Sequence, residues 1–503
     1  MPLGYLVLRA LEVDVSALGP LIFRQRTWDL WRNTLALTGL VLVFTTLISV
    51  PLAWLVVRTD LRWRKAITWL AVTPLAVPGY VMAYALLGIG GYQGLSSRIF
   101  DVMITRPSGL GGAVAALTLY TFPYLFLNLR SGLLGLDASL EESARSLGLK
   151  PFAIFRRVVL PQLLPALLAG WLVISLYVLG DFGAVALMRF ETFSFAIYTQ
   201  YASAFNRGYA AWLALMLVAL TLVLVVLELR LLGSRRYARV GSGSGRQVAR
   251  ERLGPYAPLA YAFVAFVILA SIGLPVTTLV LWMVLVPPEL AQLRSVLETF
   301  VATARLALPT ALIATLFALP VALASTRAKW FGGRLVERLV YLGYAIPPMA
   351  LALAFVMFAL RAAPWLYQTY ALLIIAFVVS FMALAIGPIR SGLLQISPRL
   401  EESARALGRG RFVAFASVTL PVIARNMLAS AALVLMVVMK ELPMTYLLGP
   451  TGFRSLSVRT FGYTNEAMLP EAAPFAAAIV LFSSLFVGLL LAYEGRRRTR
   501  APV

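Results

Sequence analysis

The chain of 503 residues contains no cysteine and no histidine. The lack of cysteine excludes disulfides and thiol chemistry, and the lack of both excludes the usual zinc sites and histidine bases. Acidic residues are also scarce, with 21 Asp and Glu against 44 Lys and Arg. An integral-membrane enzyme fits this composition poorly, because it would need a cluster of catalytic groups.

Charge of either sign is rare, at 13% of residues, whereas 61% are hydrophobic. A soluble protein of this length would need far more surface charge. Many apolar runs reach about 20 residues, enough to cross the ~30 Å hydrocarbon core of a bilayer. The net charge of +23 gathers in short Arg clusters beside these runs. Such clusters are typical of cytoplasmic loops and not of a nucleic-acid-binding surface. The sequence therefore predicts an all-α polytopic membrane protein.

The apolar runs predict about eleven clear membrane spans. Prolines such as Pro78, Pro347 and Pro348 are expected to kink helices where they occur. Between the halves lies a basic stretch with GSGSG at 241–245, whose composition predicts a flexible connector. The eleven spans are expected at residues 35–57, 66–90, 110–129, 163–188, 209–229, 256–286, 301–325, 339–360, 370–389, 422–447 and 473–493.

One polar stretch occurs twice. Residues 140–148 read LEESARSLG and residues 400–408 read LEESARALG, at an offset of 260 positions. The same offset relates Arg-Ser-Gly-Leu-Leu at 130–134 to the identical run at 390–394. The distribution of Lys and Arg puts both copies on the cytoplasmic side. Six predicted spans separate them, so the duplication is parallel and not inverted. A polar segment kept this closely between divergent apolar flanks indicates two similar surfaces offered to a partner.

Each copy predicts a short amphipathic helix that a glycine ends and that a Leu-Pro pair follows, at 160–161 and 420–421. This spacing resembles the EAA loop of type I ABC-importer permeases, although Ser143 and Ser403 replace the middle alanine of that family. The resemblance implies two parallel-repeat permease bundles whose loops form coupling helices against an ATP-binding subunit. The docking residues that it implies are Glu142, Ala144, Gly148, Glu402, Ala404 and Gly408.

The chain itself carries no nucleotide-binding loop. None of its four lysines follows a glycine, so there is no Walker A motif. The chain is therefore expected to be no enzyme and to hold no cofactor. The resemblance implies a dimer of ATP-binding subunits and an extracytoplasmic substrate-binding protein as partners. The expected location is a bacterial cytoplasmic (inner) membrane, crossed many times, with lipid and no nucleic acid around the chain.

Charged residues within the predicted spans are a second candidate site. Asp181 with Phe182 and Lys440 with Glu441 occupy equivalent positions under the offset of 260. Intramembrane charges are costly and usually face a bundle interior or a water-filled cavity. These residues either line the translocation pathway or its gate, or Lys440 pairs with Asp181 or Glu441 and holds the two halves together. Both interpretations stay open at this point, and one pair could do both.

The same segments resemble the fused two-domain permeases of ferric-iron importers, through GDFGAVAL at 180–187, MKELPMTYLL at 439–448 and PTGF at 450–453. In that family a separate binding protein holds the selective metal site, so no metal ligands are expected in this chain. Thiamine permeases share the fused architecture, and polyamine, sulfate and phosphonate permeases share the loop. An ion-driven secondary transporter is the alternative from another class, and it leaves the twin loops unexplained.

The complete protein is expected to have twelve spans, and this chain is expected to begin late within the first of them. The reason is that residues 2–8 align with residues 275–281, the outer end of the helix that opens the second half. The predicted organisation is an extracytoplasmic segment with a helix remnant at 1–29, a first transmembrane domain at 30–232, a basic cytoplasmic linker at 233–255, an extra helix and outer loop at 256–298, a second transmembrane domain at 299–494 and a basic cytoplasmic tail at 495–503.

Overall fold

The computed structural model describes residues 2–12, 19–20, 22–92, 94–136, 138–202, 206–232, 250–327, 331–397 and 399–500. Within these ranges the chain is helical, and its β-type pairing is a single isolated bridge between Thr59 and Glu251. The GSGSG stretch at 241–245, predicted to be a flexible connector, lies outside the described residues.

Nine helices in the described part of the chain are long and apolar enough to cross a membrane, and two bent helix pairs raise the number to as many as 11. This confirms the predicted all-α polytopic fold. The long helices are α3 (Gln25–Arg58), α7 (Gly109–Leu134), α10 (Leu160–Gly180), α13 (Arg207–Leu232), α14 (Ala257–Ile268) with α15 (Leu274–Leu285), α16 (Leu290–Arg327), α19 (Tyr370–Leu394), α22 (Leu420–Met439) and α25 (Leu469–Arg500).

Two predicted spans are not continuous helices. The segment Arg64–Ala76, which begins with α4 (Arg64–Val72), meets α5 (Gly79–Leu87) at 91°. In the second half α17 (Phe331–Ala345) meets α18 (Pro348–Ala362) at 102°. Pro78 and Pro347 directly precede the second helix of each pair in extended or non-helical backbone. The expected kinks are therefore sharp breaks, because proline lacks an N–H and disfavours helix in the residue before it.

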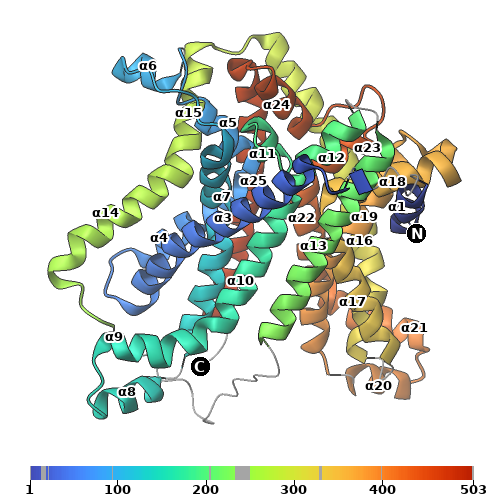
Figure 1. Cartoon of the computed structure of the whole chain (residues 1–503). Coiled ribbons are helices and arrows are strands. Elements are labelled where there is room, and N and C mark those ends of the chain that lie inside the picture. The colour runs from blue at the N-terminus through green and yellow to red at the C-terminus, as the bar shows by residue number, and fades with distance from the viewer. Residues whose placement is uncertain are drawn as a thin grey trace. The chain divides into compact units, whose positions relative to one another are not determined.

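The described chain divides into two compact units, and each takes segments from both halves of the sequence. The N-terminal unit is Gly19–Ala196 with Met216–Val286, and the C-terminal unit is Met1–Leu18, Ile197–Leu215 and Pro287–Val503. In the C-terminal unit α1 (Pro2–Leu11) packs on α18 (Figure 1), and in the N-terminal unit α15 packs on α5. The segments 2–8 and 275–281, which align in sequence, thus pack on equivalent helices.

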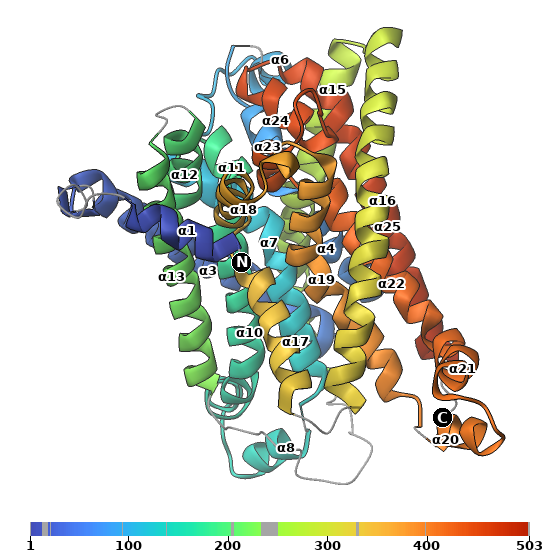
Figure 2. The ribbon, with the colours of Figure 1, turned by 90° about the vertical axis from the view of Figure 1, so that its right-hand side faces the viewer.

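The central packing repeats in the two units. Helix α3 packs on α7 and α10, and α16 packs on α19 and α22. Figure 2 shows α16 beside α22 and α25, with α24 (Leu456–Asn465) at one end of the C-terminal unit and α20 (Arg399–Ala406) at the other. Along α16 Thr303 and Thr310 are buried, whereas Leu312 and Leu316 are exposed. This distribution suits a helix whose outer face contacts lipid and whose inner face admits close neighbours.

A repeated glycine explains why the run Arg-Ser-Gly-Leu-Leu occurs in both halves. A Cβ on Gly132 would lie 3.1 Å from Cβ of Ala166, and one on Gly392 would lie 2.8 Å from Cγ of Asn426. Residues 166 and 426 are themselves related by the offset of 260. Each glycine therefore lets α7 or α19 approach the following long helix at the same level, where an added Cβ would crowd the side chain at position 166 or 426.

Wide helical turns precede three prolines. The π-helical turns Phe155–Val159, Leu269–Gly273 and Phe415–Thr419 each end two residues before Pro161, Pro275 and Pro421. A proline cannot donate to the carbonyl four residues before it, and its ring crowds that carbonyl. The π turn relieves this conflict and lets the helix continue. Pro161 and Pro421 therefore lie inside the continuous helical stretches Phe152–Gly180 and Arg411–Met439.

The glycine contact yields a prediction for stability. Gly392→Leu should destabilise the C-terminal unit by about 1–3 kcal/mol, because overpacking forces α19 away from Asn426. The measurement is the thermal unfolding midpoint of the purified protein in detergent. Gly387→Leu is the matched control, because Gly387 lies on the same helix and a Cβ added there would meet no neighbouring atom within 4 Å. Equal midpoints for the two variants would contradict the packing role.

Candidate functional site

The duplicated polar stretch forms a short helix in each unit. These helices are α8 (Ala138–Ser146) and α20 (Arg399–Ala406). Gly148 and Gly408 follow with φ of 78° and 85°, the left-handed conformation that glycine adopts without strain. The N–H of Leu149 donates to the carbonyl of Ala144, and the N–H of Arg409 donates to that of Ala404, both at 3.2 Å. Together with the bonds from the glycine N–H groups, this is a Schellman ending in both copies.

Each of these helices has an inward and an outward face. Glu141 and Ala144 are buried in the first copy, and Ala404 is buried in the second. Glu142 and Glu402 are exposed, as are Gly148 and Gly408. The structure therefore separates the six predicted docking residues: the glutamates and glycines are open to a partner, whereas the two alanines pack against their own unit.

Large apolar side chains accompany the exposed glutamates. Leu147 is 81% exposed and its counterpart Leu407 is 84% exposed. Phe152 and Phe412, also equivalent under the offset of 260, are likewise exposed. The prediction from sequence did not include these four residues, although their repetition at equal spacing was visible. We call Glu142, Leu147, Phe152 and their counterparts Glu402, Leu407 and Phe412 the twin outward surfaces.

A buried ion pair fixes the inward face of the first helix. Nη2 of Arg58, the last residue of α3, donates to Oε1 of Glu141 at 2.5 Å, and both side chains are nearly inaccessible. In the C-terminal unit Nη1 of Arg327, the last residue of α16, donates to Oε1 of Glu401 at 2.6 Å. Sequence reasoning missed all four residues. The signal was present, because both arginines end the long first apolar helix of a repeat.

Glu401 also accepts a hydrogen bond from the hydroxyl of Thr419 in the π turn. Partial burial alone would raise the pKa of Glu401, but the hydrogen bonds from Arg327 and Thr419, with the charges of Arg327 and Arg405, lower it overall. The carboxylate is therefore ionised at neutral pH and the pair is a true ion pair.

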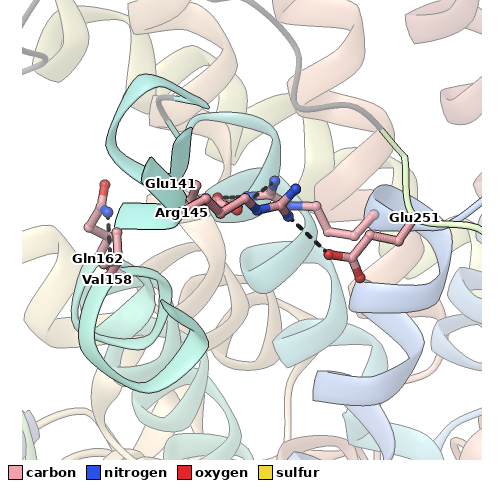
Figure 3. Close-up of polar contacts among 6 residues, drawn as sticks. Glu141, Arg145, Val158, Gln162 and Glu251 are labelled. Carbon is pink, nitrogen blue, oxygen red and sulfur yellow. Dashed lines mark hydrogen bonds and ion pairs between the residues drawn. The ribbon is translucent and has the colours of Figure 1, made fainter. Parts of the chain in front are cut away.

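The end of the linker contacts the first polar helix. Arg145 on α8 donates from Nη2 to Oε1 of Glu251 at 3.2 Å (Figure 3). Figure 3 also shows the side-chain amide of Gln162 at the carbonyl of Val158, four residues earlier in the same helical stretch. The amide nitrogen donates to this carbonyl at 2.9 Å. The backbone N–H of Glu251 donates to the carbonyl of Arg58 at 2.8 Å. Residues around Glu251, placed in the linker by sequence, thus pair with the end of α3.

The second candidate site lies where α10 and α22 end. Helix α10 stops at Gly180, so Asp181 follows the helix and does not lie within a continuous span to residue 188 as predicted. Oδ1 of Asp181 accepts from the N–H groups of Ala184 and Val185, at 3.0 and 3.1 Å, at the start of α11 (Gly183–Leu187). Its carboxylate thereby caps a short helix, where negative charge is favourable.

Glu441 makes the equivalent contacts after α22. Its two carboxylate oxygens accept from the N–H groups of Met444 and Thr445, at 2.7 and 2.9 Å, at the start of α23 (Pro443–Leu448). Lys440 beside it is buried, and in the N-terminal unit Phe182 is fully buried. In the described ranges no group of three Asp or Glu side chains is arranged to hold a metal ion. Both carboxylates thus accept hydrogen bonds from backbone N–H groups of their own unit.

Comparison with known proteins assigns the architecture. Residues 34–236 and 314–500 each match the family described as binding-protein-dependent transport system inner membrane component. The Fe(3+)-transport system permease protein FbpB 2 of Haemophilus influenzae is 32% identical over 497 residues, which cover 98% of this chain and 95% of the relative. The molybdenum transport system permease protein ModB of Escherichia coli is 27% identical over 216 residues, 41% of this chain and 94% of the relative. The sulfate transport system permease protein CysT of Salmonella typhimurium is 29% identical over 189 residues, 37% of this chain and 67% of the relative.

The capping geometry predicts different effects for two kinds of substitution. Asp181→Ala and Glu441→Ala should each lose about 1 kcal/mol of stability, because N–H groups at the start of α11 or α23 lose their acceptor. Asp181→Asn and Glu441→Gln should be nearly as stable as the unaltered protein, because a side-chain amide oxygen still accepts a hydrogen bond. The measurement is the thermal unfolding midpoint in detergent. If the amide variants were as unstable as the alanine variants, the charge and not the hydrogen bonds would be the stabilising feature.

Proposed function

The chain belongs to the family of binding-protein-dependent transport system inner membrane components and is the inner-membrane permease of an ABC importer, and we propose that its substrate is ferric iron. One observation carries the choice of substrate. The relative named as an Fe(3+) permease matches 98% of this chain, both halves included, whereas the molybdenum and sulfate permeases match 41% and 37%.

The energy for import comes, in this proposal, from a dimer of separate ATP-binding subunits. Two features support it: the chain has no Walker A lysine, and each unit presents a polar helix with the same exposed residues. The twin outward surfaces combine a carboxylate with exposed apolar side chains, Leu147 with Phe152 and Leu407 with Phe412. Exposed apolar groups rimmed by charge are typical of protein docking surfaces. Gly148 and Gly408 end the two helices and keep the following turn narrow.

Ala144 and Ala404 have a supporting role in this proposal. Both are buried against the unit that carries them, with 5% and 9% of their surface exposed. A larger side chain at either position would lift the helix off its unit, and the docking surface would move with it. The small residues that the family motif requires are thus explained by packing inside the permease.

The substrate is delivered by an extracytoplasmic binding protein that docks on segments near 189–208 and 449–472. Asp181 and Phe182, and Lys440 and Glu441, remain our proposed residues of the pathway or its gate. Their geometry supports a defined role: each carboxylate holds the start of a short helix directly after a long one. A movement of α10 or α22 would therefore be passed to α11 or α23.

The test of the substrate is uptake into proteoliposomes that contain the chain with its ATP-binding subunit and binding protein. Labelled Fe(III) should enter only with ATP, and thiamine, molybdate and sulfate in excess should not reduce its entry. ATP-dependent uptake of one of the competitors in place of iron would support the assignment as an importer and contradict the proposed substrate. Iron entry without ATP, driven by an ion gradient, would instead favour a secondary transporter.

The outward surfaces predict the effect of charge reversal. The double variant Glu142→Lys, Glu402→Lys should abolish uptake, because repulsion replaces attraction at both contacts with the ATP-binding subunits. Its amount in the membrane should stay normal, since both side chains are exposed.

The matched control is Asp29→Lys with Glu298→Lys, which changes the net charge equally at half-exposed Asp29 on α3 and exposed Glu298 on α16. Uptake by the control should equal that of the unaltered protein. Normal uptake by the variant Glu142→Lys, Glu402→Lys would show that these glutamates are not part of the docking surface.

A further inference from the structure

The same ion pair occurs at the same place in both units, although the two pairs are far apart in sequence. Arg58 ends α3 and Arg327 ends α16. Their partners Glu141 and Glu401 are the first glutamates of the repeated polar stretch. Each pair joins residues more than 70 positions apart, 58 to 141 and 327 to 401. A contact made twice by separate sequence segments points to a requirement of the transport cycle.

We propose that Arg58–Glu141 and Arg327–Glu401 are positioning contacts that make each cytoplasmic polar helix move together with the first long helix of its unit. The inference rests on the proposed function, since it assigns these four residues to the coupling of ATP hydrolysis to transport. They touch neither ATP nor substrate and act through the placement of Glu142 and Glu402.

The packing of the polar helices shows what the ion pairs add. Helix α8 packs on the segment that follows it, α9 (Pro151–Ile154) with its π turn, and α20 packs on α21 (Arg411–Ala414) with its π turn. These contacts tie each polar helix to the long helix that comes next, α10 or α22. The ion pairs tie it to α3 or α16 as well. With both links, a polar helix cannot shift without moving two long helices of its unit.

Glu401 shows this arrangement most directly. Its carboxylate accepts from Arg327 at the end of α16 and from Thr419 in the π turn that leads into α22. One side chain on α20 therefore contacts both α16 and the π turn that continues into α22. The carboxylate is ionised, as its lowered pKa indicates, and loss of its charge would weaken both hydrogen bonds at once.

The first pair is more enclosed and has further support. Its side chains are 4% and 6% exposed, against 25% and 21% for Arg327 and Glu401. The guanidinium of Arg58 also lies 5.6 Å from the ring centre of Trp54, and Trp54 packs edge-on against Phe155 of the π turn. Removing one partner of so buried a pair leaves an unpaired charge inside the protein. The second pair is therefore the better place for a test, because its variants are the more able to fold.

The experiment uses the complete transporter with Glu401→Gln, with each of the single variants Arg327→Glu and Glu401→Arg, and with the exchanged pair that combines these two. Glu298→Gln is the matched control, because it removes a carboxylate from an exposed ion pair on the same helix α16. We measure iron imported per ATP hydrolysed, together with the amount of ATP-binding subunit that co-purifies. Co-purification separates a loss of docking from a loss of transmission.

Glu401→Gln should lower the iron imported per ATP several-fold, because α20 then no longer moves fully with α16, and co-purification should be unchanged. The exchanged pair should import more per ATP than either single variant, because the attraction is restored in reverse. Normal import per ATP in Glu401→Gln would overturn the inference. So would an exchanged pair no better than its single variants, or a loss that merely follows the loss of bound subunit.

A second measurement does not depend on the substrate. The natural chain has no cysteine, so spin labels can be placed at Ala406→Cys on α20 and Leu312→Cys on α16, both at exposed positions. The distribution of distances between the labels should broaden in Glu401→Gln and stay unchanged in Glu298→Gln. An unchanged distribution in Glu401→Gln would overturn the inference. If the unaltered transporter imported no iron, the proposed substrate would fail, and the label distances would still decide whether Glu401 positions α20.

Discussion

Hydrocarbon offers no partner to a backbone N–H or C=O group, and the rest of this structure depends on that constraint. Long helices satisfy it by themselves, so the points of interest are those where a helix stops or widens. At these points other groups of the chain supply the missing hydrogen-bond partners. Asp181 and Glu441 accept from the first N–H groups of α11 and α23. The π turn before Pro161 lets a helix pass a residue that cannot donate, and Gln162 bonds the carbonyl of Val158 beside it.

The duplicated chain builds two units that share one pattern of contacts. Gly132 and Gly392 admit the following helix at the same level, and Thr34 and Thr303 each accept from the N–H at the start of a short helix, α12 (Phe193–Ala202) or α24. The units also exchange their opening segments, since α1 packs on α18 and α15 packs on α5. Each half of the chain therefore completes the other, which gives a physical reason for fusing them in one polypeptide.

The repeated polar helix divides its residues between two tasks. Adjacent glutamates point to opposite sides: Glu141 is buried against Arg58, whereas Glu142 is exposed. The inward residues hold the helix in place, and the outward residues are those that we propose to meet a partner. In this arrangement a strict sequence motif reflects both internal packing and recognition. Charge-assisted hydrogen bonds suit the inward task, because they are directional and strong where water is scarce.

The sequence by itself determined the membrane class, the eleven apolar segments and the parallel duplication, because hydropathy, charge bias and repetition are properties of the chain alone. The family followed from the resemblance of the repeated loop to a known motif. The sequence also placed Gly148 and Gly408 at helix ends, since only local backbone geometry is involved. Tertiary structure decided the rest. The direction in which Glu141 and Ala144 face, and the pairing of Arg327 with Glu401, depend on segments more than 70 residues apart. The breaks of 91° and 102° likewise could not be read from hydropathy, because a bent pair of helices has the same apolar composition as a straight span.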